Sequence, residues 1–321
     1  MPKTEKIHSV VYLRAIAALG VCIIHIQFAT GVTFNKIVDY FINSGQQGVA
    51  VFFVISGFIL PTSLYRSGYQ LKNFFRFIAK RSLRVDPPYW FSIILLFTIG
   101  LYPAKALHID RLLYHLTYLV PFVKGQEWFT GVYWTLSIEF QFYLILALLF
   151  PLLIKGPKYV SIAVLIAISL FCLRYTVRGF IISYVYDFAF GFLAFFAYTK
   201  IVNMRPFIII LVGFTVAICC FKSIASGLVP FLTVLTIVFM KTSKPVPVLS
   251  FLGNISYSIY LIHIPVMTFL GHQLSIYHLS PLALSVIFIA TIIPAAYLMF
   301  YLVEKPSMLL SKRIKLKPVI Q

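Results

Sequence analysis

The chain has 321 residues, of which 61% are apolar and only 11% charged, and its formal net charge is +19 at pH 7. A soluble domain averages about 45–50% apolar and about 25% charged residues. This composition predicts an all-α polytopic membrane protein. It leaves no room for a large soluble domain and argues against a soluble nucleic-acid-binding protein.

Ten apolar segments predict about ten transmembrane helices, because roughly 20 residues of helix cross the hydrocarbon core of a bilayer. We expect one domain over residues 1–321, with spans near residues 9–29, 47–65, 86–103, 132–154, 159–175, 179–199, 206–221, 224–240, 252–272 and 281–303. A shorter apolar patch at residues 112–123 predicts an interfacial or re-entrant piece of a loop.

The distribution of Lys and Arg predicts the orientation of these spans. With the N-terminus inside, the inner segments hold nineteen Lys and Arg residues and the outer segments hold seven, while Arg14 lies within a span. Cytoplasmic segments are enriched in these residues, so we expect both termini to be cytoplasmic. Topology and attraction to anionic lipid then explain the net charge without a nucleic-acid partner.

Two ionisable residues, Arg14 and His25, lie in the first span. They are eleven residues apart, so on a helix they share one face and lie about 16 Å apart along the axis. An Arg deep in a span costs on the order of 2.5–3.5 kcal/mol on insertion, and intramembrane ionisable residues are usually functional. The alternative is a snorkelling Arg and a hydrogen-bonded packing His.

The segment after the second span is strongly basic. If it is helical, the i, i+4 spacing places Arg76, Lys80 and Arg84 on one stripe, with Arg81 beside it. Pro87 and Pro88 then end this helix and begin the third span. Such a cluster repels itself unless an anion neutralises it, and Arg suits bidentate contact with phosphate. A patch that binds lipid headgroups is the alternative.

The second and fourth spans contain further polar residues. Ser56 offers a hydroxyl in the middle of the second span, next to Gly57, although small residues in a span more often serve close helix packing. Glu139 lies several residues inside the fourth span and needs a partner there. Arg14 and His25 are the candidate partners.

The ninth span has a polar side. Its polar residues fall at near-helical spacing and predict either the lining of a polar cavity or ordinary aromatic-belt residues; they are Asn254, Tyr257, Tyr260 and His263. At the end of the tenth span, the stretch Val303-Glu304-Lys305-Pro306 predicts a helix terminus followed by a basic tail.

Five sequence blocks, in order along nearly the whole chain, resemble the acyltransferase-3 family of integral-membrane acyltransferases. The blocks are Arg14 and His25 separated by ten residues, F-F-V-I-S-G-F at Phe52–Phe58, R-S-L-R-V-D-P-P-Y-W at Arg81–Trp90, W-T-L-S-I-E at Trp134–Glu139, and I-S-Y-S-I-Y-L-I-H at Ile255–His263.

The resemblance implies a bacterial inner-membrane protein of about ten helices. It implies transfer of an acyl group, usually acetyl, from cytoplasmic acetyl-CoA to a sugar hydroxyl of a cell-surface polysaccharide or its lipid-linked precursor. In the family, the residues corresponding to Arg14 and His25 are treated as catalytic, and the Arg pair corresponding to Arg81 and Arg84 matters for activity.

This chain departs from the family pattern at two positions. Many members have an acidic residue in the second block where this chain has Ala50, and many have two consecutive acids where it has Glu139 and Phe140. Glu139 would therefore act alone.

The resulting hypothesis is an O-acyltransferase with His25, Arg14 and Glu139 as catalytic residues. His25 would act as general base on the sugar hydroxyl or as an acyl-accepting nucleophile. Glu139 would orient the imidazole ring, and Arg14 would stabilise the oxyanion or hold the thioester.

Binding of the acyl-CoA donor is predicted at Arg81 and Arg84, with Arg76 in support and Ser56 within the span, and no metal is expected. The alternative is a transporter or flippase of a lipid-linked glycan, which would use the same charged residues as a substrate path. A non-catalytic anchor in a polysaccharide assembly complex would leave the intramembrane Arg, His and Glu unexplained.

Overall fold

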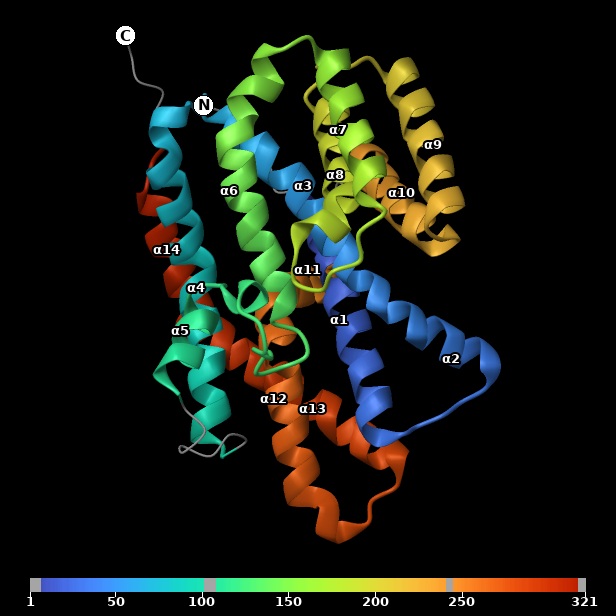
Figure 1. Ribbon diagram of the computed structural model, residues 1–321. Helices are drawn as coiled ribbons and strands as arrows, with labels where there is room; N and C mark the ends of the chain where they lie inside the picture. Colours follow the sequence, from blue (N-terminus) through green and yellow to red (C-terminus); the bar gives the residue numbers. More distant parts are fainter. Residues whose placement is uncertain (1–6, 101–107, 241–244, 317–321) are drawn as a thin grey trace.

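The computed structural model describes residues 7–100, 108–240 and 245–316, and within these ranges the chain forms helices and no strands (Figure 1). The α-helices are α1 (His8–Thr30), α2 (Lys36–Asn43), α3 (Gly48–Arg66), α4 (Phe74–Thr98), α5 (Ile109–Leu116), α6 (Trp134–Lys155), α7 (Lys158–Cys172), α8 (Val185–Tyr198), α9 (Met204–Phe221), α10 (Ile224–Phe239), α11 (Pro247–Asn254), α12 (Ser256–Leu274), α13 (Pro281–Met299) and α14 (Lys305–Arg313). Short 3-10 turns are η1 (Ser44–Gln47), η2 (Leu71–Asn73), η4 (Val120–Phe122), η5 (Ile181–Tyr184) and η6 (Ser275–Tyr277), and η7 (Phe300–Glu304) is a π-helix.

The predicted all-α membrane fold is confirmed, and each of the ten predicted spans overlaps a helix; residues 101–103 of the third span lie outside the described residues. α7 and α10 are apolar but shorter, with 15 and 16 residues, and α4 joins a basic first half to an apolar second half. Within the described ranges, seven helical stretches are long and apolar enough to cross a membrane: His8–Thr30, Lys36–Arg66, Trp134–Lys155, Ile181–Tyr198, Met204–Phe221, Ser256–Tyr277 and Pro281–Arg313.

The helices pack in two groups joined through α1 and α3. In one group α8 lies against α3, α7 and α10, and α9 lies against α10; in the other, α12 and α13 pack on each other and on α1 (Figure 1). α4 runs beside α14, α6 and α12. Helices α1, α3, α4, α6 and α12 therefore meet around one region of the molecule.

The crossing of α3 and α8 is close because a glycine stands at the contact on both helices. A Cβ atom on Gly57 would overlap the backbone of Phe188, and one on Gly191 would overlap the Val54 carbonyl and the backbone of Gly57. Small residues allow the backbones of membrane helices to approach in this way. The contact places Ser56, the neighbour of Gly57, at a fixed position.

The predicted helix break before the third span is wrong. α4 continues through Pro87 and Pro88 without interruption. Each proline removes one N–H donor from the helix. α4 packs against α6, α12 and α14, and next to the prolines the Tyr257 hydroxyl donates to the Val85 carbonyl at 2.9 Å. The basic cluster therefore belongs to the same helix as the third span.

The last two spans also differ from the prediction. The ninth is divided into α11 and α12 at Ile255. The tenth does not end near residues 303–306, because η7 and α14 continue it to Arg313. The wider turn of the π-helix changes the helical register, and the side chain of Glu304 is 3% exposed.

The predicted apolar patch at residues 112–123 forms the end of α5 and η4, and its placement relative to a bilayer stays a prediction. His115, in α5, is fully buried. Its Nε2 accepts the Phe129 backbone N–H at 3.0 Å, and its Nδ1 donates to the Arg111 carbonyl at 2.8 Å. Burial lowers the pKa of His115 to about 4, so the ring is neutral at pH 7.

Candidate active site

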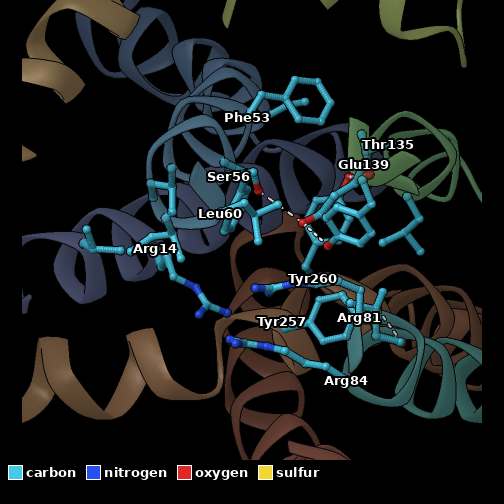
Figure 2. A pocket seen from close by; sticks show the side chains of 18 of the residues that line it. Arg14, Phe53, Ser56, Leu60, Arg81, Arg84, Thr135, Glu139, Tyr257 and Tyr260 are labelled. Atoms are coloured by element: carbon cyan, nitrogen blue, oxygen red, sulfur yellow. Dashed lines mark hydrogen bonds between the residues drawn. The ribbon is translucent and has the colours of Figure 1, made fainter. Parts of the chain in front are cut away.

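A cavity of about 240 Å³ lies between α1, α3, α4, α6, α12 and η7. Apolar side chains from α1, α3, α4 and α6 form part of its wall, and charged and hydroxyl-bearing side chains form the rest (Figure 2). Three guanidinium groups outnumber two carboxylates, so the cavity attracts anions. The polar residues that line it are Arg14, Ser56, Arg81, Arg84, Thr135, Glu139, Tyr143, Tyr257, Tyr260 and Glu304.

The three arginines come from two helices. Arg14 extends from α1, and Arg81 and Arg84 lie one turn apart on α4; Figure 2 shows the guanidinium groups of Arg14 and Arg84 turned toward each other. Arg81 is 8% exposed, its Cζ lies 5.5 Å from the centre of the Phe77 ring and 6.0 Å from that of Tyr143, and its Nε has no hydrogen-bond partner. Like charges this close repel one another unless an anion lies between them.

Glu139 is held by two hydroxyl groups. The Ser56 Oγ donates to its Oε1 at 3.1 Å, and the Tyr143 hydroxyl donates to the same oxygen at 2.5 Å (Figure 2). Tyr143 lies one turn further along α6, and Ser56 reaches across from α3. The predicted orientation of the His25 ring by Glu139 is therefore not seen, because both hydrogen bonds to Glu139 come from other residues.

Glu304 is the second carboxylate of the cavity, and sequence reasoning missed it. The Ser258 Oγ donates to its Oε2 at 2.6 Å, and both side chains are buried. The sequence around Glu304 predicts the end of a span. An acid that directly follows an uninterrupted apolar helix was the one signal that pointed to this position.

The polar side of the ninth span lines the cavity through two of its four residues, Tyr257 and Tyr260. The Tyr260 hydroxyl lies 2.8 Å from the Thr135 Oγ1 and donates to the Val132 carbonyl at 3.2 Å. Thr135 lies in the first turn of α6. These bonds join α12 to the start of α6 at one end of the cavity.

His25 does not line the cavity but lies against His263. The Nδ1 of His25 is 2.7 Å from the Val21 carbonyl oxygen and 3.3 Å from the Nε2 of His263. The two ring centres are 5.1 Å apart, and the His263 ring lies 6.0 Å from that of Tyr260. The histidine pair therefore adjoins the cavity at Tyr260. On α1, His25 lies about 16 Å along the helix axis from Arg14.

Arg76 is not brought to this site. Its side chain is exposed near the start of α4 and does not line the cavity. The structure thus gathers five of the seven predicted residues around one cavity and leaves His25 beside it and Arg76 on the surface. Among the described residues, no group of three or more His, Cys, Asp and Glu side chains is placed to hold a metal ion.

Phe140 stands where the resemblance stated above led us to expect a second acid. Its ring stacks on Tyr118, with centres 4.8 Å apart. Tyr118 has a φ of 63°, in the left-handed region that non-glycine residues rarely adopt. The Ser137 hydroxyl donates to the Tyr118 carbonyl at 2.9 Å, and the Tyr118 hydroxyl donates to Asp86 at 2.7 Å. Position 140 thus serves packing in this chain.

The fold and the site define a multi-pass helical membrane protein with an anion-attracting cavity between its helices. Residues 7–301 match the family described as an acyltransferase domain, Acyl_transf_3, and the chain belongs to this acyltransferase family. It is similar to Nodulation protein 10 of Rhizobium leguminosarum bv. viciae, with 29% identity over 141 residues, an alignment that covers 37% of each chain. No solved structure matches this chain.

Proposed function

We propose that this membrane acyltransferase transfers an acyl group, with acetyl the expected one, from acyl-CoA to a hydroxyl of a cell-surface polysaccharide or its lipid-linked precursor. The family supports the reaction class. The observation that carries the choice of donor is the group of Arg14, Arg81 and Arg84 around one cavity. Guanidinium groups bind phosphate through paired N–H donors, and CoA presents its phosphates at one end of a long flexible arm.

The arrangement of the helices supports a path for this arm. With the phosphates at the arginines, the arm would extend along α1 past Tyr260, over about 16 Å, to His25. The apolar wall of the cavity suits the alkyl parts of the arm. Glu139, held in place by Ser56 and Tyr143, would accept hydrogen bonds from the amide groups of the CoA arm.

His25 is the group we propose for the chemical step, as a general base or as an acyl-accepting nucleophile. In the orientation predicted by the positive charges, both termini are cytoplasmic and His25 lies in the outer half of its span. The CoA head would then stay on the cytoplasmic side of a bacterial inner membrane while the acyl group meets the acceptor further out.

The proposal is tested with purified protein in lipid nanodiscs, supplied with acetyl-CoA labelled in the acetyl group and with lipid-linked or polymeric glycan from the source cell. We expect release of free CoA together with labelled glycan from the wild type and neither from His25→Ala. In cells lacking the gene, mass spectrometry is expected to show glycan of normal amount without its acetyl groups. Loss or accumulation of the whole glycan, without CoA release by the purified protein, would favour a transporter instead.

A further inference from the structure

The two histidines beside the cavity make an unequal set of contacts. His25 is half-buried on α1, whereas His263 is fully buried on α12. The Nδ1 of His263 lies 3.1 Å from the Ile259 carbonyl oxygen, while its Nε2 faces the Nδ1 of His25. Each ring therefore has its Nδ1 beside a backbone carbonyl four residues earlier in its own helix.

These contacts fix where the protons lie. A carbonyl oxygen only accepts hydrogen bonds, so the Nδ1 of His25, 2.7 Å from the Val21 oxygen, carries a hydrogen. The same argument places a hydrogen on the Nδ1 of His263. A neutral imidazole holds one N–H, so the Nε2 of His263 bears a lone pair that shares the Nδ1–H of His25 with Val21. The Nε2 of His25 is then unprotonated and basic.

The opposite assignment leaves two contacts without a hydrogen. If the Nε2 of His263 donated to His25, the Nδ1 lone pair of His25 would face the Val21 oxygen at 2.7 Å. The Nδ1 lone pair of a neutral His263 would likewise face the Ile259 oxygen. Both contacts would be repulsive, so the hydrogen-bond pattern selects one tautomer for each ring.

We propose that His263 is the positioning residue for His25: together with the Val21 carbonyl it accepts the Nδ1–H of His25 and so directs the basic Nε2 toward the acceptor hydroxyl. The inference rests on the proposed function. The acceptor oxygen forms a C–O bond with the thioester carbonyl carbon as its proton passes to the Nε2 of His25. The C–S bond then breaks, and the CoA thiolate takes that proton from Nε2, which restores the neutral ring.

A neutral partner suits this location. Hydrolytic triads commonly use a carboxylate to hold the Nδ1–H of a catalytic histidine. Between membrane helices an additional permanent charge is costly to desolvate. The lone pair of His263 offers the same hydrogen-bond geometry, so that during the step the pair holds a single charge, on His25.

The test compares substitutions of His263 that keep and remove an acceptor. His263→Phe keeps a ring without nitrogen, whereas His263→Gln can present its amide oxygen near the former Nε2. We expect His263→Phe to lower kcat about 10- to 100-fold with CoA affinity and KM for acyl-CoA unchanged, and His263→Gln to restore most of kcat. His272→Phe, an exposed histidine on the same helix, is the matched control and is expected to keep wild-type kcat.

A second measurement does not depend on the folding of any His263 variant. Nitrogen-15 NMR of the histidine-labelled wild type, with the His25 signals assigned by their loss in His25→Ala, is expected to show Nδ1 protonated and Nε2 unprotonated. An Nε2–H tautomer at His25, or wild-type kcat in a folded His263→Phe protein, would overturn the proposal. So would a folded His263→Gln protein as impaired as His263→Phe. Absence of acyl transfer by the wild type would instead overturn the proposed function, and this inference with it.

Discussion

Arg84 and Arg76 belong to the same helix but differ in surroundings, which gives a direct test of the donor site. Only Arg84 lines the cavity, and Arg76 is exposed. Lys keeps the positive charge and loses the planar fork that pairs with phosphate. We expect Arg84→Lys to raise the KM for acyl-CoA about 10-fold, equivalent to about 1.4 kcal/mol, and Arg76→Lys to leave it unchanged. Initial rates over a range of acyl-CoA concentrations measure this.

An equal rise in KM for both variants would contradict a specific phosphate site and favour attraction by the basic surface as a whole. A KM that stays unchanged in Arg84→Lys would remove Arg84 from the donor site.

At the level of single residues, the sequence was informative wherever a charge stood inside an apolar run. Arg14 and Glu139 stood out for this reason, and both line the cavity. Their partners could not be predicted, because a hydrogen bond between helices depends on helix rotation and packing. Ser56 and Tyr143 donate hydrogen bonds to Glu139, and His263 contacts His25. The sequence offers Arg14 and His25 as partners of Glu139, and of these only Arg14 lines the same cavity.

Two glycines, one in the crossing of α3 and α8 and one in α9, are expected to respond to substitution in opposite ways. Gly191 lies in that crossing without room for a Cβ, whereas a Cβ on Gly213, in α9, meets no atom within 4 Å. We expect Gly191→Ala to destabilise the protein by about 1–3 kcal/mol through overpacking. Gly213→Ala is expected to stabilise α9 by up to about 1 kcal/mol. Thermal unfolding in detergent is expected to show shifts of opposite sign, and equal shifts would contradict this packing.

His115 in α5 predicts a loss of stability in acid. Burial lowers the pKa of its ring to about 4 from a usual 6.5, so below pH 6.5 the unfolded chain binds a proton that the folded chain excludes. Folding free energy is therefore lost as the pH falls from about 6.5 toward 4, by about 2 kcal/mol between pH 7 and pH 5. His115→Gln keeps an acceptor for the Phe129 N–H without titrating. It is expected to lose about 2 kcal/mol less over this interval in thermal unfolding, and a parallel loss in both proteins would refute the assignment.

At the level of elements, the lengths of the apolar segments predict most helices correctly, but the positions of the helix ends are harder to predict. Pro87 and Pro88 predict a break because proline lacks an N–H donor, yet α4 is continuous through both and packs against α6, α12 and α14. The sequence around Glu304 read as a terminus, and the π-helix that turns this residue inward has no sequence signal of its own. Both errors come from tertiary packing that a local pattern does not contain.

For the whole molecule, the excess of positive charge on one side predicts the topology. Reporter fusions at Gln70, between α3 and α4, and at Lys315, after α14, are expected to read cytoplasmic, and a fusion at Gln126, before α6, is expected to read external. A cytoplasmic reading at Gln126 would reverse the placement of His25 in the outer half of its span. The same reporter inserted at all three positions controls for differences in expression.

The grouping of three arginines in one cavity has a consequence for turnover. On the proposed function, they bind the phosphate end of the donor, which the reaction leaves intact, and the acyl group that is transferred contributes little to recognition. Spent CoA then competes with fresh acyl-CoA for the same arginines at nearly equal affinity. The rate of modification would follow the cellular ratio of acyl-CoA to free CoA rather than the amount of acyl-CoA alone. The extent of acylation at the outer surface would then vary with the acyl supply inside the cell.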